Sequence, residues 1–214
     1  MYLLSSLPAW LLSALHLDTP VDPEYMRPPD EIVACEQRLT NSGVQFSPSK
    51  IALHASPDGS FVCGAPQVVR YEGGPGKIRY SASKPKMACP LALAFADFER
   101  IIQEEAQAQL GQKVVKINHV GTYNCRQMVL YEGFVSEHSY ANGMDIKSFV
   151  LADGSELTIS KDYFDEDAGG QFLRGLAKRI YAEGVFSVVM TPNSDSLHKH
   201  HLHVDTAHYR FDGT

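Results

Sequence analysis

The chain has 214 residues, of which 44% are hydrophobic and 21% are charged. This composition is typical of a globular protein with room for a substantial core, and it excludes a disordered or fibrous protein. The formal net charge is −6 and no run of Lys or Arg occurs, so the sequence argues against a nucleic-acid-binding protein.

Residues 1–31 are expected to precede the folded domain. Residues 2–15 are apolar, but no Lys or Arg occurs before Arg27, Pro8 interrupts the run and no A-x-A site follows. The apolar run has the length of the core of a secretory signal and is too short to span a bilayer. A poor export signal, an amphipathic segment packed on the body and a terminus that differs from the natural one all stay open. Residues 18–31 hold four prolines and five acidic residues, which indicates a linker.

The sequence then predicts a single domain over residues 32–214, with an accessory part at 32–88 and a core that carries the functional site at 89–214. A short helix is expected over residues 32–43, followed by small strands and loops to residue 82, because turn signals interrupt short apolar pieces. Residues 90–110 are the clearest helix. Pro90 suits the first turn, Gly111 suits the C-terminal stop, and apolar residues recur between them at helical spacing.

The second half of the chain alternates strands and helices. Strands are expected at residues 114–123, at 146–150 and 156–160 around a hairpin turn, and at 186–190. A second amphipathic helix is marked by Phe172 and Ile180 and stopped by Gly184. Hairpins together with separate helices predict an α+β fold, with a small antiparallel sheet and flanking helices.

The four cysteines, Cys35, Cys63, Cys89 and Cys125, form no C-x-x-C pair, which argues against a zinc knuckle or a thioredoxin-like site. An even number at wide spacings favours two disulfides in an oxidising compartment. Four reduced, buried thiols are the alternative. Three disulfide pairings are possible, and the sequence does not choose among them.

Histidine is the outlier of the composition. Of nine histidines, five lie between positions 198 and 208. Residues 201–205 alternate as in a strand, which predicts Leu202 and Val204 on the core face and His201, His203 and Asp205 on the opposite face. Such a face suits metal binding or acid–base chemistry; a solvated strand face is the alternative. The interruption of the histidines by Leu, Lys and Val argues against a purification tag.

A second polar segment, residues 136–145, reads S-E-H-S-Y-A-N-G-M-D. Gly143 is expected to let the chain turn so that His138 and Asp145 converge. These two side chains and one C-terminal histidine would supply three zinc ligands. Three protein ligands leave a fourth position for water, which is the catalytic pattern.

The segment S-E-H-S-Y-A-N-G-M-D-I resembles the S-x-H-x-x-G-x-A-x-D motif of zinc D-Ala-D-Ala peptidases, with Ala141 in place of the motif's glycine. It is more similar to the S-E-H-x-x-x-N-A-x-D-I segment of bacterial proteins with an extensin-like C-terminal domain. His198-x-x-His201-x-His203 resembles the closing H-x-x-H-x-H of the same Hedgehog/DD-peptidase superfamily, which includes the penicillin-insensitive murein endopeptidases. Residues 121–126 resemble that family's G-S-Y-x-C-R, and residues 89–92 its cysteine-led helix start.

This resemblance covers residues 89–205 well and residues 35–89 more thinly. It implies that His138, Asp145 and His203 bind one Zn²⁺. It also implies that His201 acts beside the metal as an acid/base group, with His198 as a supporting proton-transfer residue.

Three more residues take roles from the same resemblance. Arg126 would face the substrate, where it could clamp a carboxylate or stabilise oxyanion charge; a surface salt bridge is the alternative. Ser136 would position the substrate or serve as a turn hydroxyl. Asp205 would orient a ligand imidazole rather than bind the metal.

The resemblance implies a zinc metallopeptidase of the periplasm or cell exterior, of endopeptidase or D,D-carboxypeptidase type. It would hydrolyse an amide bond of peptidoglycan through a metal-activated water. The alternative is a non-catalytic zinc-containing module that binds wall peptides or a protein, since the Hedgehog signalling domain shares the fold. A metal-buffering protein is disfavoured because it would leave residues 138–145 unexplained. A mechanism with Cys125 as the nucleophile is disfavoured because no nearby group other than Arg126 would activate its thiol. No nucleic-acid or membrane partner is indicated, and the oligomeric state stays open.

Overall fold

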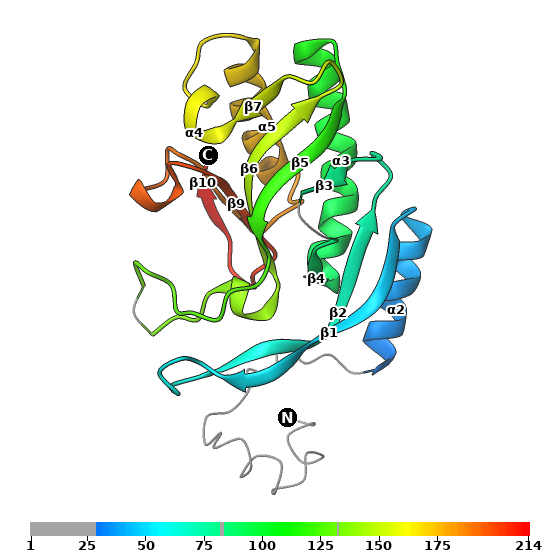
Figure 1. The fold of residues 1–214 in the computed structure, drawn as a ribbon, viewed down its shortest axis with the longest axis vertical. Helices are drawn as coiled ribbons and strands as arrows, with labels where there is room; N and C mark the ends of the chain where they lie inside the picture. The colour runs from blue at the N-terminus through cyan, green and yellow to red at the C-terminus, as the bar shows by residue number, and fades with distance from the viewer. Residues whose placement is uncertain (1–28, 82–83, 132) are drawn as a thin grey trace, which may run out of the picture.

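The structure is a computed structural model that describes residues 29–81, 84–131 and 133–214 (Figure 1). The expectations for residues 1–28 lie outside this range. The first described element, α2 (Pro29–Asn41), begins earlier than expected, within the predicted linker. Its start is favourable because proline suits the first helical turn and the acidic side chains of Asp30 and Glu31 interact well with the helix N-terminus.

The next segment forms two long strands rather than several small ones. The strands β1 (Gln45–Ala55) and β2 (Val62–Gly73) pair antiparallel, and β4 (Lys86–Ala88) joins β2 to complete a three-stranded sheet. Gly64 lies inside β2 with φ 115°, where an added Cβ would lie 2.5 Å from the carbonyl oxygen of Ala52. The glycine therefore permits an irregular register within the hairpin rather than a break.

Two helices cover the larger sheet. The helix α3 (Cys89–Leu110) confirms the clearest prediction, and it ends at Gly111 in the left-handed conformation. The helix α5 (Ala168–Ala182) is longer than its apolar residues indicated, because the side chain of Asp167 caps it by accepting from the backbone N–H of Gly170. The two helices lie side by side behind the sheet in Figure 1, and they pack directly on each other.

The larger sheet has seven strands, with the order β10-β8-β9-β6-β5-β3 and with β7 paired to β6. The prediction of one small antiparallel sheet is therefore wrong. The described residues form two sheets, and the larger is mixed, because β3 pairs parallel with β5 and β10 pairs parallel with β8. The remaining pairs are antiparallel. The bounds are β3 (Arg79–Tyr80), β5 (Val114–Gly121), β6 (Gly143–Leu151), β7 (Glu156–Thr158), β8 (Val188–Met190), β9 (Leu202–Asp205) and β10 (Phe211–Gly213).

Three short helical turns complete the fold. The turn α4 (Ile159–Asp162) takes residues that were expected to extend the hairpin strand beyond Thr158. The turns η2 (Glu137–Tyr140) and η3 (Ser196–His198) lie in the segments that carry the polar motifs. The α+β class is thus confirmed, and the two 3-10 turns place the motif residues at the end of the larger sheet.

One apolar cluster joins the two sheets and the helices. Leu39 of α2, Tyr71 of β2, Phe95 of α3, Phe149 of β6 and Phe172 of α5 are all fully buried in it. Burial of these large side chains is the main stabilising contribution to the fold. None of the described helices has the length and apolar character that crossing a bilayer requires.

Both predicted disulfides form. Cys35 pairs with Cys89 and ties α2 to the start of α3, while Cys63 pairs with Cys125 and ties β2 to the segment after β5. The structure thereby selects one of the three pairings that the sequence left open. Two disulfides fit an oxidising compartment.

Candidate metal centre

The pairing of β6 with β9 brings the two polar motifs together. Asp145 lies directly opposite His203 in this antiparallel pair, so the two side chains share one face of the sheet. Leu202 and Val204 are buried on the other face, as the alternation predicted. A residue 58 positions away along the chain thereby becomes the nearest neighbour of His203.

His138 reaches the same point from η2. The hydroxyl of Ser136 caps this turn by accepting from the backbone N–H of His138, and Ala141 ends it with φ 55°. The predicted turn role of Gly143 is wrong, because the chain turns at Ala141. Gly143 instead leaves room for the side chain of His203, because a Cβ at position 143 would lie 3.1 Å from its imidazole ring.

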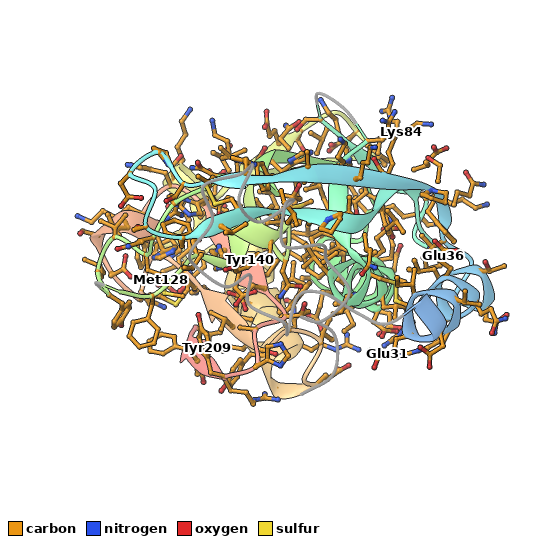
Figure 2. All side chains as sticks on the ribbon, turned by 90° about the horizontal axis from the view of Figure 1, so that it is seen from below. Glu31, Glu36, Lys84, Met128, Tyr140 and Tyr209 are labelled. Carbon is orange, nitrogen blue, oxygen red and sulfur yellow. A yellow bond between two sulfur atoms is a disulfide. The ribbon has the colours of Figure 1, made fainter. Side chains whose placement is uncertain are left out.

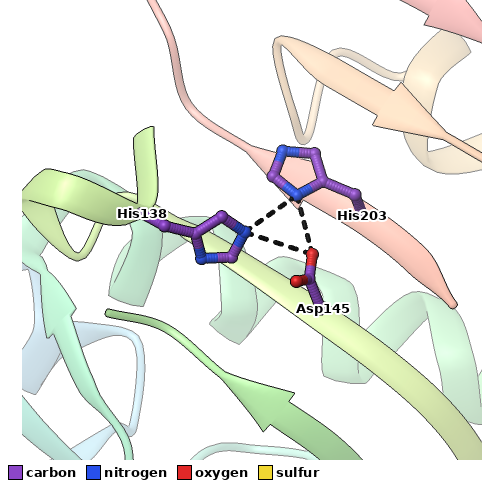
Figure 3. Close-up of side chains that lie close together, drawn as sticks. All are labelled: His138, Asp145 and His203. Atoms are coloured by element: carbon purple, nitrogen blue, oxygen red, sulfur yellow. Dashed lines mark hydrogen bonds and ion pairs between the residues drawn. The ribbon is translucent and has the colours of Figure 1, made fainter. Parts of the chain in front are cut away.

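Three potential ligand atoms converge in Figure 3. His138 Nε2 lies 3.1 Å from Asp145 Oδ1 and 3.1 Å from His203 Nδ1, and His203 Nδ1 lies 2.9 Å from Asp145 Oδ1. All three atoms lie within 4.8 Å of one another. Two imidazole nitrogens and one carboxylate oxygen are a donor set that zinc accepts, so these residues fit the predicted metal.

The outer nitrogens of both imidazoles are held as well. His138 Nδ1 lies 3.3 Å from the carbonyl oxygen of Thr122, and His203 Nε2 lies 3.0 Å from Asp205 Oδ2. The other oxygen of Asp205 accepts from the backbone N–H of Ala207. Such contacts orient metal-binding imidazoles. The structure thus places Asp205 where the sequence predicted an orienting carboxylate.

The electrostatics of the cluster follow from burial and mutual contact. Burial alone would raise the pKa of Asp145, but hydrogen bonds from His138 and His203 outweigh it and hold that pKa well below its usual range. Burial likewise lowers the pKa of His203, but hydrogen bonds to Asp145 and Asp205 raise it to about 10. A bound cation would replace the proton of His203, because zinc takes neutral imidazole.

His201 and His198 lie beside the three converging residues. The strand β9 begins at Leu202, so His201 lies just before it rather than within it. Its Nε2 is still 3.5 Å from Asp145 Oδ1, and its ring centroid is 5.1 Å from that of His198. Burial lowers the pKa of His201 to about 4, so its imidazole is neutral at pH 7.

Arg126 and Ser136 are held by the loop around the centre. The backbone N–H of Arg126 donates to Ser139 Oγ, and its guanidinium donates to the carbonyl oxygen of Gln127. Among the described residues, this guanidinium makes no hydrogen bond with His138, Asp145 or His203. Ser136 is buried as the cap of η2. The substrate-binding roles expected for both residues stay predictions.

Sequence reasoning missed two residues near the centre. Asp195 Oδ1 lies 2.8 Å from His198 Nδ1 and also caps η3; its place three residues before His198, ahead of a short turn, is the signal that could have found it. Tyr209 lies within electrostatic reach of Asp205, Glu137 and Tyr131, and burial together with these neighbours raises the pKa of its phenol. No local pattern marks Tyr209.

Comparison with known proteins identifies the family of this chain. A family model described as Extensin-like protein C-terminus matches residues 33–213, a range that includes both disulfides and every residue of the candidate metal centre. No curated protein and no solved structure gives a significant match. Because the family model covers most of the chain, this protein belongs to the Extensin-like protein C-terminus family.

Proposed function

We propose that this protein is a zinc-dependent peptidase that hydrolyses an amide bond of bacterial cell-wall peptidoglycan. The convergence of His138 Nε2, Asp145 Oδ1 and His203 Nδ1 carries the proposal. Two histidines and one carboxylate are the ligand number and type of catalytic zinc sites, which keep a further position for water or substrate.

The chain supplies the groups that such a hydrolysis needs. When bound, zinc lowers the pKa of water and polarises a carbonyl group. His201 Nε2 lies 3.5 Å from Asp145 Oδ1, so it would be placed to accept a proton from the attacking water and to return it to the leaving amine. His198 packs against His201 and is itself held by Asp195. Arg126 is assigned to a substrate carboxylate or to oxyanion charge.

The same motifs support a relation to the Hedgehog/DD-peptidase superfamily. The segment from Ser136 to Ile146 and the H-x-x-H-x-H from His198 to His203 resemble its metal-binding motifs, and their key side chains lie together. The two disulfides favour an oxidising compartment such as the bacterial periplasm.

The test is mass spectrometry of purified peptidoglycan after incubation with the zinc-loaded protein. Fragments of defined mass are expected, together with their loss on chelation and in His203→Ala. His200→Ala is the matched control, because His200 lies in the same histidine-rich segment but its side chain is exposed and outside the cluster; it should keep full activity.

The outcomes separate the candidate functions. Tight zinc binding by the wild type without any released fragment would replace the peptidase with the non-catalytic zinc-containing binding module. Unchanged hydrolysis by His203→Ala would overturn the metal assignment itself. Fragment masses from the wild type would also identify the bond that is cut.

A further inference from the structure

An exposed apolar loop lies next to the candidate metal centre. We define the apolar loop as residues 127–131 and 133–135, between β5 and η2, where the chain projects at the lower left of Figure 1. A single bridge between Gln127 and Val135 closes its base. Four large side chains in it are more than half exposed: Val129 (67%), Leu130 (53%), Tyr131 (53%) and Phe134 (63%). Apolar side chains gathered in this way mark a contact surface.

The base of the apolar loop is fixed to the segment that carries His138. The backbone N–H of Ser136 donates to the carbonyl oxygen of Arg126, and Ser139 Oγ bonds both the N–H and the carbonyl oxygen of Arg126. The disulfide between Cys63 and Cys125 anchors the same base to β2. Whatever binds the apolar loop is therefore held beside the metal centre.

Tyr209 extends this surface from a different part of the chain. It lies in the connection from β9 to β10, it is 46% exposed, and its phenol is within electrostatic reach of Tyr131 and of Asp205, which holds His203. Figure 2, seen from below, shows Met128 of the apolar loop and Tyr209 on the same side of the molecule. Aromatic rings from two segments thus lie near the candidate site.

The size and the charge of this surface limit the kinds of partner that could bind it. The four loop side chains present on the order of 400 Å² of exposed surface, about half of the roughly 800 Å² per partner that a standard protein–protein interface buries. Only Glu132 is charged within residues 127–135, and the whole chain carries a net charge of −6, so nothing here attracts an anionic bilayer. A small, uncharged partner with apolar faces fits best.

We propose that the apolar loop and Tyr209 bind the sugar rings of the glycan strand, so that the substrate is a glycan-linked peptide rather than a free one. This inference rests on the proposed function. The C–H-rich face of a pyranose ring is apolar and stacks on an aromatic ring, while its hydroxyls can bond the phenols of Tyr131 and Tyr209. The aliphatic Val129 and Leu130 suit the methyl groups of N-acetyl substituents.

The test measures binding of a neutral N-acetylglucosamine tetramer to the full chain by calorimetry, without zinc or hydrolysis. The double variant Tyr131→Ala/Phe134→Ala should bind at least about fivefold more weakly than the wild type, since each of the two aromatic contacts contributes about twofold to tenfold. Phe164→Ala is the matched control: Phe164 is 62% exposed but follows α4, away from the apolar loop. It should bind as the wild type does.

The results separate this inference from the proposed function. Tetramer binding without peptidoglycan hydrolysis would support glycan recognition and overturn only the peptidase. Hydrolysis by a wild type that does not bind the tetramer, or equal binding by all three proteins, would overturn glycan recognition. If tetramer binding is unchanged in the double variant but phosphatidylcholine vesicle binding is lost, the apolar loop binds lipid instead. If tetramer binding is unchanged but self-association is lost, the apolar loop binds a second copy of the chain.

Discussion

His203 and Asp205 share one face of β9, yet their neighbours give them different tasks. His203 directs Nδ1 to Asp145 and His138, whereas Asp205 is 2% exposed and holds the far nitrogen of His203 at 3.0 Å. The alternation of the strand puts both side chains on one face, but only the contact with Asp145 and His138 makes one of them a candidate ligand. The alternation could be predicted from the sequence alone, whereas the choice of His203 as the candidate ligand came from the family resemblance.

His119 of β5 carries a half-buried imidazole outside the metal centre. Both of its ring nitrogens are buried and have no hydrogen-bond partner among the described residues, and its ring meets that of Tyr80 edge-on. Burial lowers the pKa of His119, and an interaction with the backbone of Ser81 offsets this only in part. The folded protein therefore keeps His119 neutral at pH values where the unfolded chain has begun to protonate it.

We expect His119→Phe to raise the free energy of unfolding by about 1 kcal/mol at pH 7.5, since it removes two unpaired buried nitrogens. The gain should be larger at pH 5. Below pH 6.5, about the pKa of an unfolded histidine, the unfolded wild-type chain binds a proton that the folded protein does not. The free energy of unfolding of the wild type therefore falls as the pH falls, whereas that of the variant lacks this contribution. Urea unfolding of both proteins at the two pH values measures the difference, and an equal gain at both would contradict the argument.

At the scale of elements, local signals located the helices better than the strands. The apolar period and Gly111 predicted α3 closely, because helix geometry and caps depend on residues a few positions apart. The hairpin of β1 and β2 was predicted as small pieces, because turn signals such as Gly64 interrupt the strand pattern, although Gly64 lies within β2. Pairing with a neighbouring strand stabilises an extended strand despite such interruptions, and the local sequence does not show which strand will pair with it.

The two disulfides join different elements. Removing each in turn separates an effect on the free energy of unfolding from an effect on zinc binding. Their sequence separations, 54 and 62 residues, are nearly equal, so loss of either should lower the free energy of unfolding by a similar amount, about 2–4 kcal/mol. Only Cys63→Ala/Cys125→Ala should also weaken zinc binding, because Cys125 holds the segment in which Thr122 orients His138. Denaturant titration and competition with a zinc chelator measure the two effects.

The Cys35→Ala/Cys89→Ala variant serves as the internal control of that experiment. Cys35 and Cys89 join α2 to α3, outside the connection from β5 to β6 that carries Thr122, Cys125 and His138. If both double variants lost zinc affinity equally, the anchoring role given to the Cys63–Cys125 bond would be wrong.

At the scale of the whole molecule, we expect the core to stay folded without a bound metal. One apolar cluster joins both sheets and the main helices, in contrast to small zinc domains that unfold without metal. We expect chelation to abolish peptidoglycan hydrolysis while the far-ultraviolet circular dichroism stays that of the folded protein. Zinc at 100 times its Kd contributes about 2.7 kcal/mol, so its removal should lower the Tm by about 5–10 °C. Unfolding on chelation at room temperature would contradict this.

The sequence by itself determined what depends on near neighbours: the α+β class, the amphipathic helices, the buried face of β9 and the residue types of the two polar motifs. Only the tertiary structure decided which cysteines pair, that β3 and β10 run parallel to their neighbours, and that Gly143 makes room for His203. It also decided that His138 meets His203 across 65 residues of chain. Helical period and caps are local, whereas pairing and ligand convergence arise from contacts between residues far apart in sequence.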